Sequence, residues 1–158
     1  MKFRYTKFTD HPAPGQSITI LRPIIPIGLR YRGKTVPGYS VMIDSGADDC
    51  LFHAEIGEAL GIDMNAGMEK SYSGVGFGEL KGRRHPVEIH IGGYWLTCDV
   101  TFCYGMVRDH PAFPGMKQGL RYGILGQRGF FDKFKVMFDY IGEEIELRPR
   151  DTALLSLS

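Results

Sequence analysis

Short runs of alternating apolar and polar residues, separated by glycine and proline, constrain this chain more than any other feature. The ranges 25–31, 39–43, 87–91 and 95–102 show the two-residue period of half-buried β-strands. Gly92-Gly93 joins two of these ranges and predicts a hairpin turn. The 158 residues include 21 glycines and 9 prolines, above average but below the level of low-complexity chains. The sequence therefore predicts a turn-rich, mostly β protein.

Fewer signals indicate other kinds of structure. Ranges 135–140 and 144–147 predict a closing hairpin, and 53–60 predicts a helix. A second short helix is expected over 129–134. The range 105–122 contains two prolines and three glycines without a sustained period, so we expect a long loop there. We expect one or two short helices in all.

Nothing divides the chain into parts. It has no internal repeat and no linker-like stretch, so residues 1–158 are expected to form a single domain. The core of that domain is expected to span about 26–147.

The charge balance and the cysteines limit the possible partners and compartment. Lys and Arg total 19 against 18 for Asp and Glu, so no charge excess favours a nucleic-acid or membrane partner. Lys2 and Arg4 are not followed by the apolar run of a secretory signal. Cys50, Cys98 and Cys103 fit neither a zinc motif nor a disulfide framework. We therefore expect a cytoplasmic protein with reduced thiols, without a metal or other cofactor.

The densest chemical signal is a carboxylate at the end of an apolar strand. Val41-Met42-Ile43 leads directly into Asp44, which Ser45 and Gly46 follow. The strand would hold Asp44 near the interior, and the sharp turn would direct backbone N–H groups back toward its carboxylate. An ordinary junction between a strand and a turn is the alternative, because Asp and Gly are common there.

Two glycine elements farther along the chain add to this signal. In the segment 124–126 an apolar pair is closed by glycine, which permits the close approach of another backbone. In the segment 73–78 glycine alternates with other residues, as at a hairpin tip. A phosphate-binding loop is excluded because Glu79 and Lys81 occupy the positions where its third glycine is required.

Taken in order, these elements resemble the retropepsin-like aspartic peptidases, in particular their bacterial single-domain members. The run Asp44-Ser45-Gly46-Ala47-Asp48-Asp49 is followed by a helix ending at Leu60-Gly61-Ile62, the glycine hairpin, and Ile124-Leu125-Gly126. The segment 130–139 is similar to the ending of those bacterial relatives. The resemblance covers about 26–147 and implies a closed β-barrel of the acid protease fold.

The resemblance also implies a role for individual residues. The catalytic residue would be Asp44, and the rest of the active-site loop would be Ser45, Gly46 and Ala47. Residues in contact with the substrate would be Asp48 and Asp49, together with the flap tip of Gly74, Val75 and Gly76. Supporting residues would be Ile124, Leu125, Gly126 and Arg128. Relatives often carry arginine directly after the downstream glycine; here Gln127 precedes Arg128, and a pair between Asp48 and Arg128 is expected.

The mechanism of such enzymes implies assembly. Aspartic proteolysis uses two carboxylates that share one proton, whereas this chain carries a single Asp-Ser/Thr-Gly triplet. Two chains would each contribute Asp44 at a two-fold axis. The expected function is therefore a homodimeric aspartic endopeptidase that hydrolyses peptide or protein substrates.

Three alternatives remain open at the level of sequence. A non-catalytic dimerisation or peptide-binding module would fit the long 105–122 segment and the displaced Arg128. A metal site could be built from Asp44, Asp48 and Asp49. A Cys50 nucleophile is the weakest alternative, because no pairing with histidine is visible.

Overall fold

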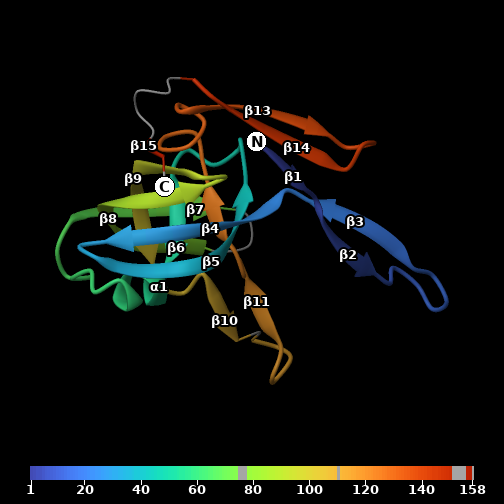
Figure 1. Ribbon diagram of the computed structural model, residues 1–158. Coiled ribbons are helices and arrows are strands. Elements are labelled where there is room, and N and C mark those ends of the chain that lie inside the picture. Colours follow the sequence, from blue (N-terminus) through green and yellow to red (C-terminus); the bar gives the residue numbers. More distant parts are fainter. Residues whose placement is uncertain (75–77, 110, 151–155, 158) are drawn as a thin grey trace.

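The computed structural model describes residues 1–74, 78–109, 111–150 and 156–157. Strands make up most of it, with one short helix among the described residues (Figure 1). In chain order the elements are β1 (Lys2–Arg4), β2 (Thr6–Asp10), β3 (Ile18–Arg22), β4 (Ile24–Tyr31), β5 (Lys34–Ile43), β6 (Cys50–His53), α1 (Ala54–Ala59), β7 (Met68–Gly74), β8 (Gly78–Ile91), β9 (Tyr94–Cys103), β10 (Val107–Asp109), β11 (Lys117–Gly119), β12 (Gly123–Leu125), β13 (Phe134–Asp139), β14 (Glu144–Pro149) and β15 (Ser156–Leu157).

Six strands close into a barrel. The order β9, β6, β12, β5, β4 and β8 returns on itself, because β8 also pairs with β9. Most neighbours are antiparallel, whereas β12 and β5, and likewise β6 and β9, run parallel. Closure gives each of the six strands a hydrogen-bonded partner on both sides. The expectation of a mostly β chain with a closed barrel is confirmed.

The alternation in the sequence corresponds to the inside and outside of the barrel. On β4 the side chains of Ile25, Ile27 and Leu29 are buried, and the residues between them face outward or lie at the surface. β8 and β9 repeat this pattern with Val87, Ile89, Ile91, Leu96, Cys98, Val100 and Phe102. A hydrophobic core of these side chains fills the barrel.

Two tight turns close hairpins of the barrel. Arg32 and Gly33 connect β4 and β5 with φ of 46° and 83°. Gly92 and Gly93 connect β8 and β9 with φ of 55° and 91°, at the hairpin turn that the sequence predicts. Two successive residues with positive φ match the right-handed twist of the flanking strands.

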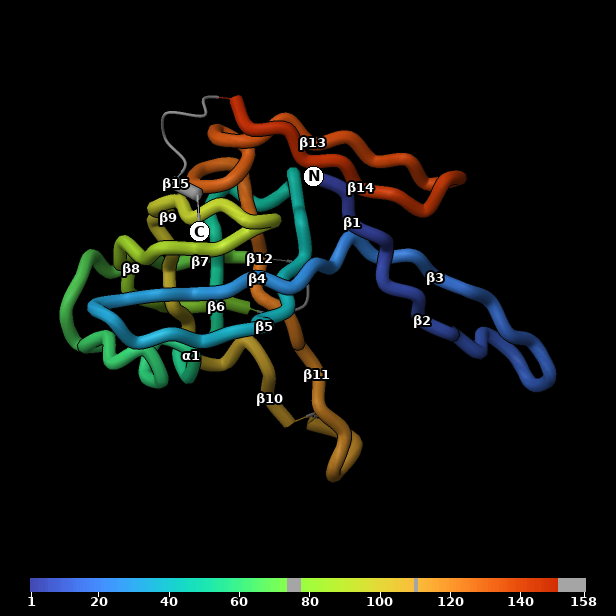
Figure 2. The backbone as a smooth tube through the Cα atoms, viewed as in Figure 1, coloured from blue at the N-terminus to red at the C-terminus, as the bar shows by residue number. Residues whose placement is uncertain are grey.

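Three hairpins project from the barrel, β2–β3, β10–β11 and β13–β14 (Figure 2). The closing hairpin β13–β14 is present where the sequence predicts it, and β1 adds a third strand to it. α1 lies within the predicted helix 53–60. No helix in the described part of the chain has the length and apolar character needed to cross a membrane.

Two predicted elements are wrong. Residues 129–134 form consecutive turns instead of a helix; Gly129 has φ +105°, outside the helical region, and Phe134 already begins β13. The range 105–122 is not an irregular loop, because β10 and β11 pair within it. Each of these strands has three residues, too few for an alternating pattern to be recognised. The strands β1, β2 and β3, before the expected core, were also not expected.

Candidate active site

Two parallel strands meet at the candidate site. β5 and β12 lie side by side with Ile43 opposite Leu125. Because parallel strands end at the same edge of a sheet, the residues that follow them, Asp44 and Gly126, leave the barrel together. The N–H of Asp44 donates to the carbonyl of Leu125 at 3.0 Å. The predicted catalytic loop and the predicted supporting segment are therefore in direct contact.

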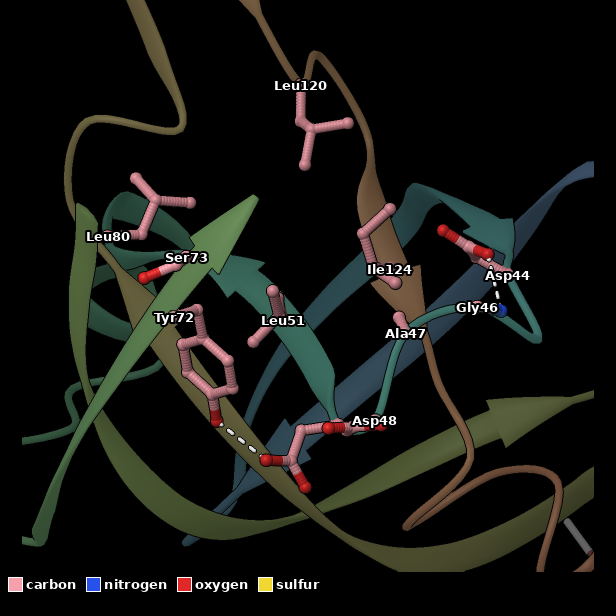
Figure 3. A pocket seen from close by; sticks show the side chains of 11 residues that line it. Asp44, Gly46, Ala47, Asp48, Leu51, Tyr72, Ser73, Leu80, Leu120 and Ile124 are labelled. Atoms are coloured by element: carbon pink, nitrogen blue, oxygen red, sulfur yellow. Dashed lines mark hydrogen bonds between the residues drawn. The ribbon is translucent and has the colours of Figure 1, made fainter. Parts of the chain in front are cut away.

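Asp44 is half-buried, and its carboxylate is oriented by the turn that follows it. The N–H of Gly46 donates to Asp44 Oδ1 at 2.8 Å (Figure 3), as the sequence suggested. The N–H of Ala47 donates to the Asp44 carbonyl at 3.2 Å, which closes the turn. A Cβ on Gly46 would lie only 3.2 Å from the same Oδ1. Ser45 lies exposed within this turn, and its carbonyl accepts a hydrogen bond from Gln127 at 2.9 Å.

Gly126 is required by the close approach of two backbones. A Cβ at this position would lie 2.3 Å from the carbonyl oxygen of Asp49 and 2.8 Å from that of Ala47. Beside it, the N–H of Gln127 donates to the Ala47 carbonyl at 2.8 Å. Any side chain would therefore push the 44–49 loop away from the loop after β12.

An ion pair between the exposed Arg128 and the buried Asp49 fixes the far end of the 44–49 loop. The Arg128 guanidinium donates to the two carboxylate oxygens of Asp49, from Nε at 2.7 Å and from Nη2 at 3.0 Å. The Tyr72 hydroxyl donates to Asp49 Oδ2 at 2.9 Å. The Asp49 side chain is only 5% exposed. The hydrogen bond from Arg128 lowers the pKa of Asp49, and the bond from Tyr72 adds to this against the opposing effect of burial.

The expected pair between Asp48 and Arg128 is wrong. Asp49 and Arg128 form a parallel β-bridge, so the side chain that meets the arginine is that of Asp49. Neighbouring residues in extended backbone point to opposite sides, which leaves Asp48 exposed and facing the cleft. Asp49 also lines the cleft, and its two carboxylate oxygens are bound by Arg128 and Tyr72, so it supports the loop. Its contact with substrate stays a prediction.

A cleft of about 400 Å³ opens beside Asp44 (Figure 3). Its polar side is formed by the 44–49 loop, with the carboxylates of Asp44 and Asp48. Its apolar side is formed by Leu51, Leu80, Leu120 and Ile124. This combination of an acid and an apolar wall suits an extended peptide with an apolar side chain.

The hairpin β7–β8 provides one wall of the cleft at the position of the predicted flap. Tyr72 lies opposite Leu80 in its register, and both line the cleft together with Ser73. Gly74 ends β7 opposite Gly78. Val75 and Gly76, the rest of the predicted flap tip, lie outside the described residues.

A hydrogen-bond chain ties the base of the β10–β11 hairpin to the barrel. His53 Nε2 lies 2.8 Å from the Leu120 carbonyl, which can only accept, so Nε2 carries the proton. His53 Nδ1 then accepts from the Tyr39 hydroxyl at 2.6 Å, and that hydroxyl oxygen accepts from the His53 N–H at 3.2 Å. Burial raises the pKa of Tyr39, which keeps it a donor. These hydrogen bonds hold Leu120 in the wall of the cleft.

Sequence reasoning missed five cleft residues: Leu51, Tyr72, Ser73, Leu80 and Leu120. For Tyr72 and Leu80 a signal was present, because both lie near the glycine hairpin at positions that pair across it. Leu120 carried none, since it belongs to a segment without periodicity. Leu51 follows the acidic loop closely but reads as an ordinary core residue.

Two of the alternative chemistries lack suitable residues. The described residues contain no group of three or more His, Cys, Asp or Glu side chains placed to hold a metal ion. A site built from Asp44, Asp48 and Asp49 would need the Asp49 carboxylate, which Arg128 already binds. Cys50 is fully buried, with its Sγ 3.7 Å from that of Cys98, so it presents no nucleophile to the cleft.

Of the comparisons with known proteins, the one with solved structures gives a match. No protein-family model matches the sequence, and a search of curated proteins finds no match. Among solved structures the chain is similar to the crystal structure of a retropepsin-like aspartic protease from Rickettsia conorii, with 17% sequence identity and a TM-score of 0.45. That similarity covers 92% of this chain and 95% of the other.

Proposed function

We propose that this protein is an aspartic endopeptidase that acts as a homodimer. The observation that carries the proposal is the position of Asp44, at the end of a barrel strand and at the edge of an open cleft, with its carboxylate oriented by the Gly46 N–H at 2.8 Å. A carboxylate directed into a cleft with apolar walls is suited to acid–base chemistry on a bound peptide.

The chemistry needs a second carboxylate. Two facing carboxylates hold one proton between them, because like charges so close cannot both ionise. The ionised member takes a proton from water, whose oxygen attacks the scissile carbonyl carbon. The protonated member gives its proton to the carbonyl oxygen. Collapse of the resulting diol then breaks the C–N bond: one diol hydroxyl returns its proton to the carboxylate that had given one up, and the amine leaves with the proton taken from water, so the pair again holds one proton.

A two-fold homodimer supplies that second carboxylate. Each chain contributes one Asp44, so the two active-site loops would face each other at the axis. Ser45 is exposed within its turn, and its hydroxyl would bond across this axis. In this proposal the separated chains are inactive.

The walls of the cleft suggest roles for other residues. Asp48 and the backbone of Ala47 would meet the substrate main chain, and the β7–β8 hairpin with Gly74, Val75 and Gly76 would close over it. Leu51, Leu80, Leu120 and Ile124 would accept an apolar side chain. Gly126 and the Asp49–Arg128 pair would keep the loop in place.

The decisive experiment compares two isosteric variants on a diverse peptide library from mildly acidic to neutral pH. We expect Asp44→Asn to abolish cleavage because it removes the titrating group without changing its size. Asp99→Asn is the matched control, since Asp99 lies outside the cleft with a 54% exposed side chain, and it should cleave like the wild type. Full activity in Asp44→Asn, or no cleavage by the wild-type protein, would refute the proposal. Peptide binding without product, equal in wild type and Asp44→Asn, would instead support a peptide-binding module.

A further inference from the structure

The β2–β3 hairpin extends away from the barrel as an arm (Figures 1 and 2). Its strands pair only with each other among the described residues, from Thr6 opposite Arg22 to Asp10 opposite Ile18. An isolated two-stranded hairpin is marginally stable in water and normally needs a third strand or a packed face. We therefore expect this arm to pack against a further surface.

One face of the arm carries its apolar side chains, Phe8, Ile18 and Ile20, together with Thr6, Asp10 and Arg22. Phe8 lies directly opposite Ile20, and Asp10 lies opposite Ile18, so these side chains share a face. Near the barrel this face is covered, because the ring of Tyr122 lies 6.1 Å from that of Phe8 in an edge-to-face contact. Farther out, Ile18 is 48% exposed. The apolar side chains of this face are thus covered near the barrel, and Ile18, opposite Asp10, is open to solvent.

The arm starts beside the candidate catalytic residue. The N–H of Ile43, the residue before Asp44, donates to the carbonyl of Pro23 at 2.9 Å, and Pro23 directly follows the arm. The Thr6 hydroxyl donates to the Ile24 carbonyl at 3.1 Å. Because β4 begins where β5 ends, the arm leaves the barrel at the end that carries Asp44.

Contacts within the chain fix the base of the arm. The N–H of Tyr5 donates to the Glu143 carbonyl at 3.2 Å, and Lys7 pairs with the Glu143 carboxylate at 2.6 Å. The ring of Tyr5 also packs 6.2 Å from that of Tyr140, in the turn between β13 and β14. Next to it, Ile141 is 91% exposed. The arm and this turn together present apolar side chains outside the barrel.

We propose that the arm docks on a second copy of this chain and is the main element of the dimer interface. The proposal rests on the function proposed above, because a two-fold axis at Asp44 places the partner in front of the barrel end from which the arm projects. Each strand of the arm alone spans about 17 Å, the length over which the arm would lie against the partner. Each copy would give one arm and receive one, as in an isologous interface.

A hollow beside the base of the arm offers a place for contact. It measures about 270 Å³ and is lined by residues including Phe8, Met42, Leu120 and Tyr122. Met42 precedes Asp44 by two residues, and Leu120 also lines the cleft. Docking here would therefore connect assembly to the walls of the active site.

The test uses two neighbouring positions on opposite faces of β3. Ile18→Asp places a charge on the face that carries Phe8 and Ile20, and Thr19→Asp places the same charge on the other face. Both are made in an Asp10→Asn background, because Asp10 lies opposite Ile18 and would repel a new carboxylate there. Both positions are exposed in the single chain, so both variants should fold. Measured by sedimentation over a range of concentrations, Ile18→Asp should raise the dimer dissociation constant at least about tenfold. Thr19→Asp should leave it within about twofold of the wild type.

The outcomes separate this inference from the proposed function. A wild-type protein that stays monomeric, or equal effects of Ile18→Asp and Thr19→Asp, overturns the inference whatever the enzymatic result. Loss of dimer in Ile18→Asp alone supports it, even if Asp44→Asn were to retain activity and so refute the function. If both proposals hold, adding Ile18→Asp protein at rising concentration should recover cleavage as the dimer reforms.

Discussion

The close approach at Gly126 gives a quantitative prediction for Gly126→Ala. The added Cβ would lie 2.3 Å from the carbonyl oxygen of Asp49, 2.6 Å from its carbonyl carbon and 2.8 Å from the Ala47 oxygen. Normal contact lies about 1 Å beyond the first of these distances. All three atoms are backbone, so no side-chain rotation can relieve the overlap. The 44–49 loop must therefore move by about 1 Å relative to the loop after β12.

That displacement should reduce stability and activity to different extents. Crowding of this kind costs about 1–3 kcal/mol of the free energy of unfolding, from which a gain of roughly 0.5 kcal/mol is subtracted for the stiffer unfolded chain. For a chain of this length we expect the melting temperature to fall by about 1–10 °C. A shift of about 1 Å in a catalytic group lowers kcat/KM on the order of 100-fold. Activity should therefore fall far more than the folded fraction.

The measurements are urea unfolding and peptide cleavage on the same preparation. The control is Gly33→Ala, in the β4–β5 turn at the other end of β5, where φ is +83° but nothing lies within 4 Å of the added Cβ. It should lose about 1 kcal/mol of stability from backbone strain and keep its kcat/KM. The reasoning would be refuted if Gly126→Ala kept both stability and activity, or if the two variants lost activity equally.

Three further predictions concern the ion pair, the hairpin and the thiols. Asp49→Asn should destabilise the fold by about 2 kcal/mol at pH 7. Because the hydrogen bond from Arg128 lowers the pKa of Asp49, this stability is present above the ordinary pKa of about 3.9 and is lost as the pH falls below it. The free energies of unfolding of variant and wild type should therefore converge in acid, and a difference that stays constant with pH would contradict this role of the ion pair. His53→Ala frees the Leu120 carbonyl and should speed proteolysis within 105–122, which an unchanged digestion pattern would disprove. All three cysteines are buried and should react with a thiol reagent only after denaturation, whereas labelling of the native protein would contradict this packing.

The sequence by itself determined which segments form the main barrel strands and where Asp44 lies relative to them. Residues that alternate over five or more positions can bury one face only as strands, which gave β4, β5, β8 and β9 with their connecting turns. The apolar run before Asp44, and the glycine two residues after it, placed a carboxylate at a strand end with a backbone donor beside it. Both conclusions depend on local chain geometry, so the amino-acid order suffices for them.

The tertiary structure decided which distant residues meet. The parallel pairing of β5 with β12 sets the register at Arg128. A shift of one residue in this register would make Asp48, and not Asp49, the partner of Arg128. Leu120 joins the cleft through His53, a contact across 67 positions that no local pattern encodes. The arm formed by β2 and β3 was missed because Asp10 shares a face with Phe8, Ile18 and Ile20 and so interrupts the apolar pattern by which a strand is recognised.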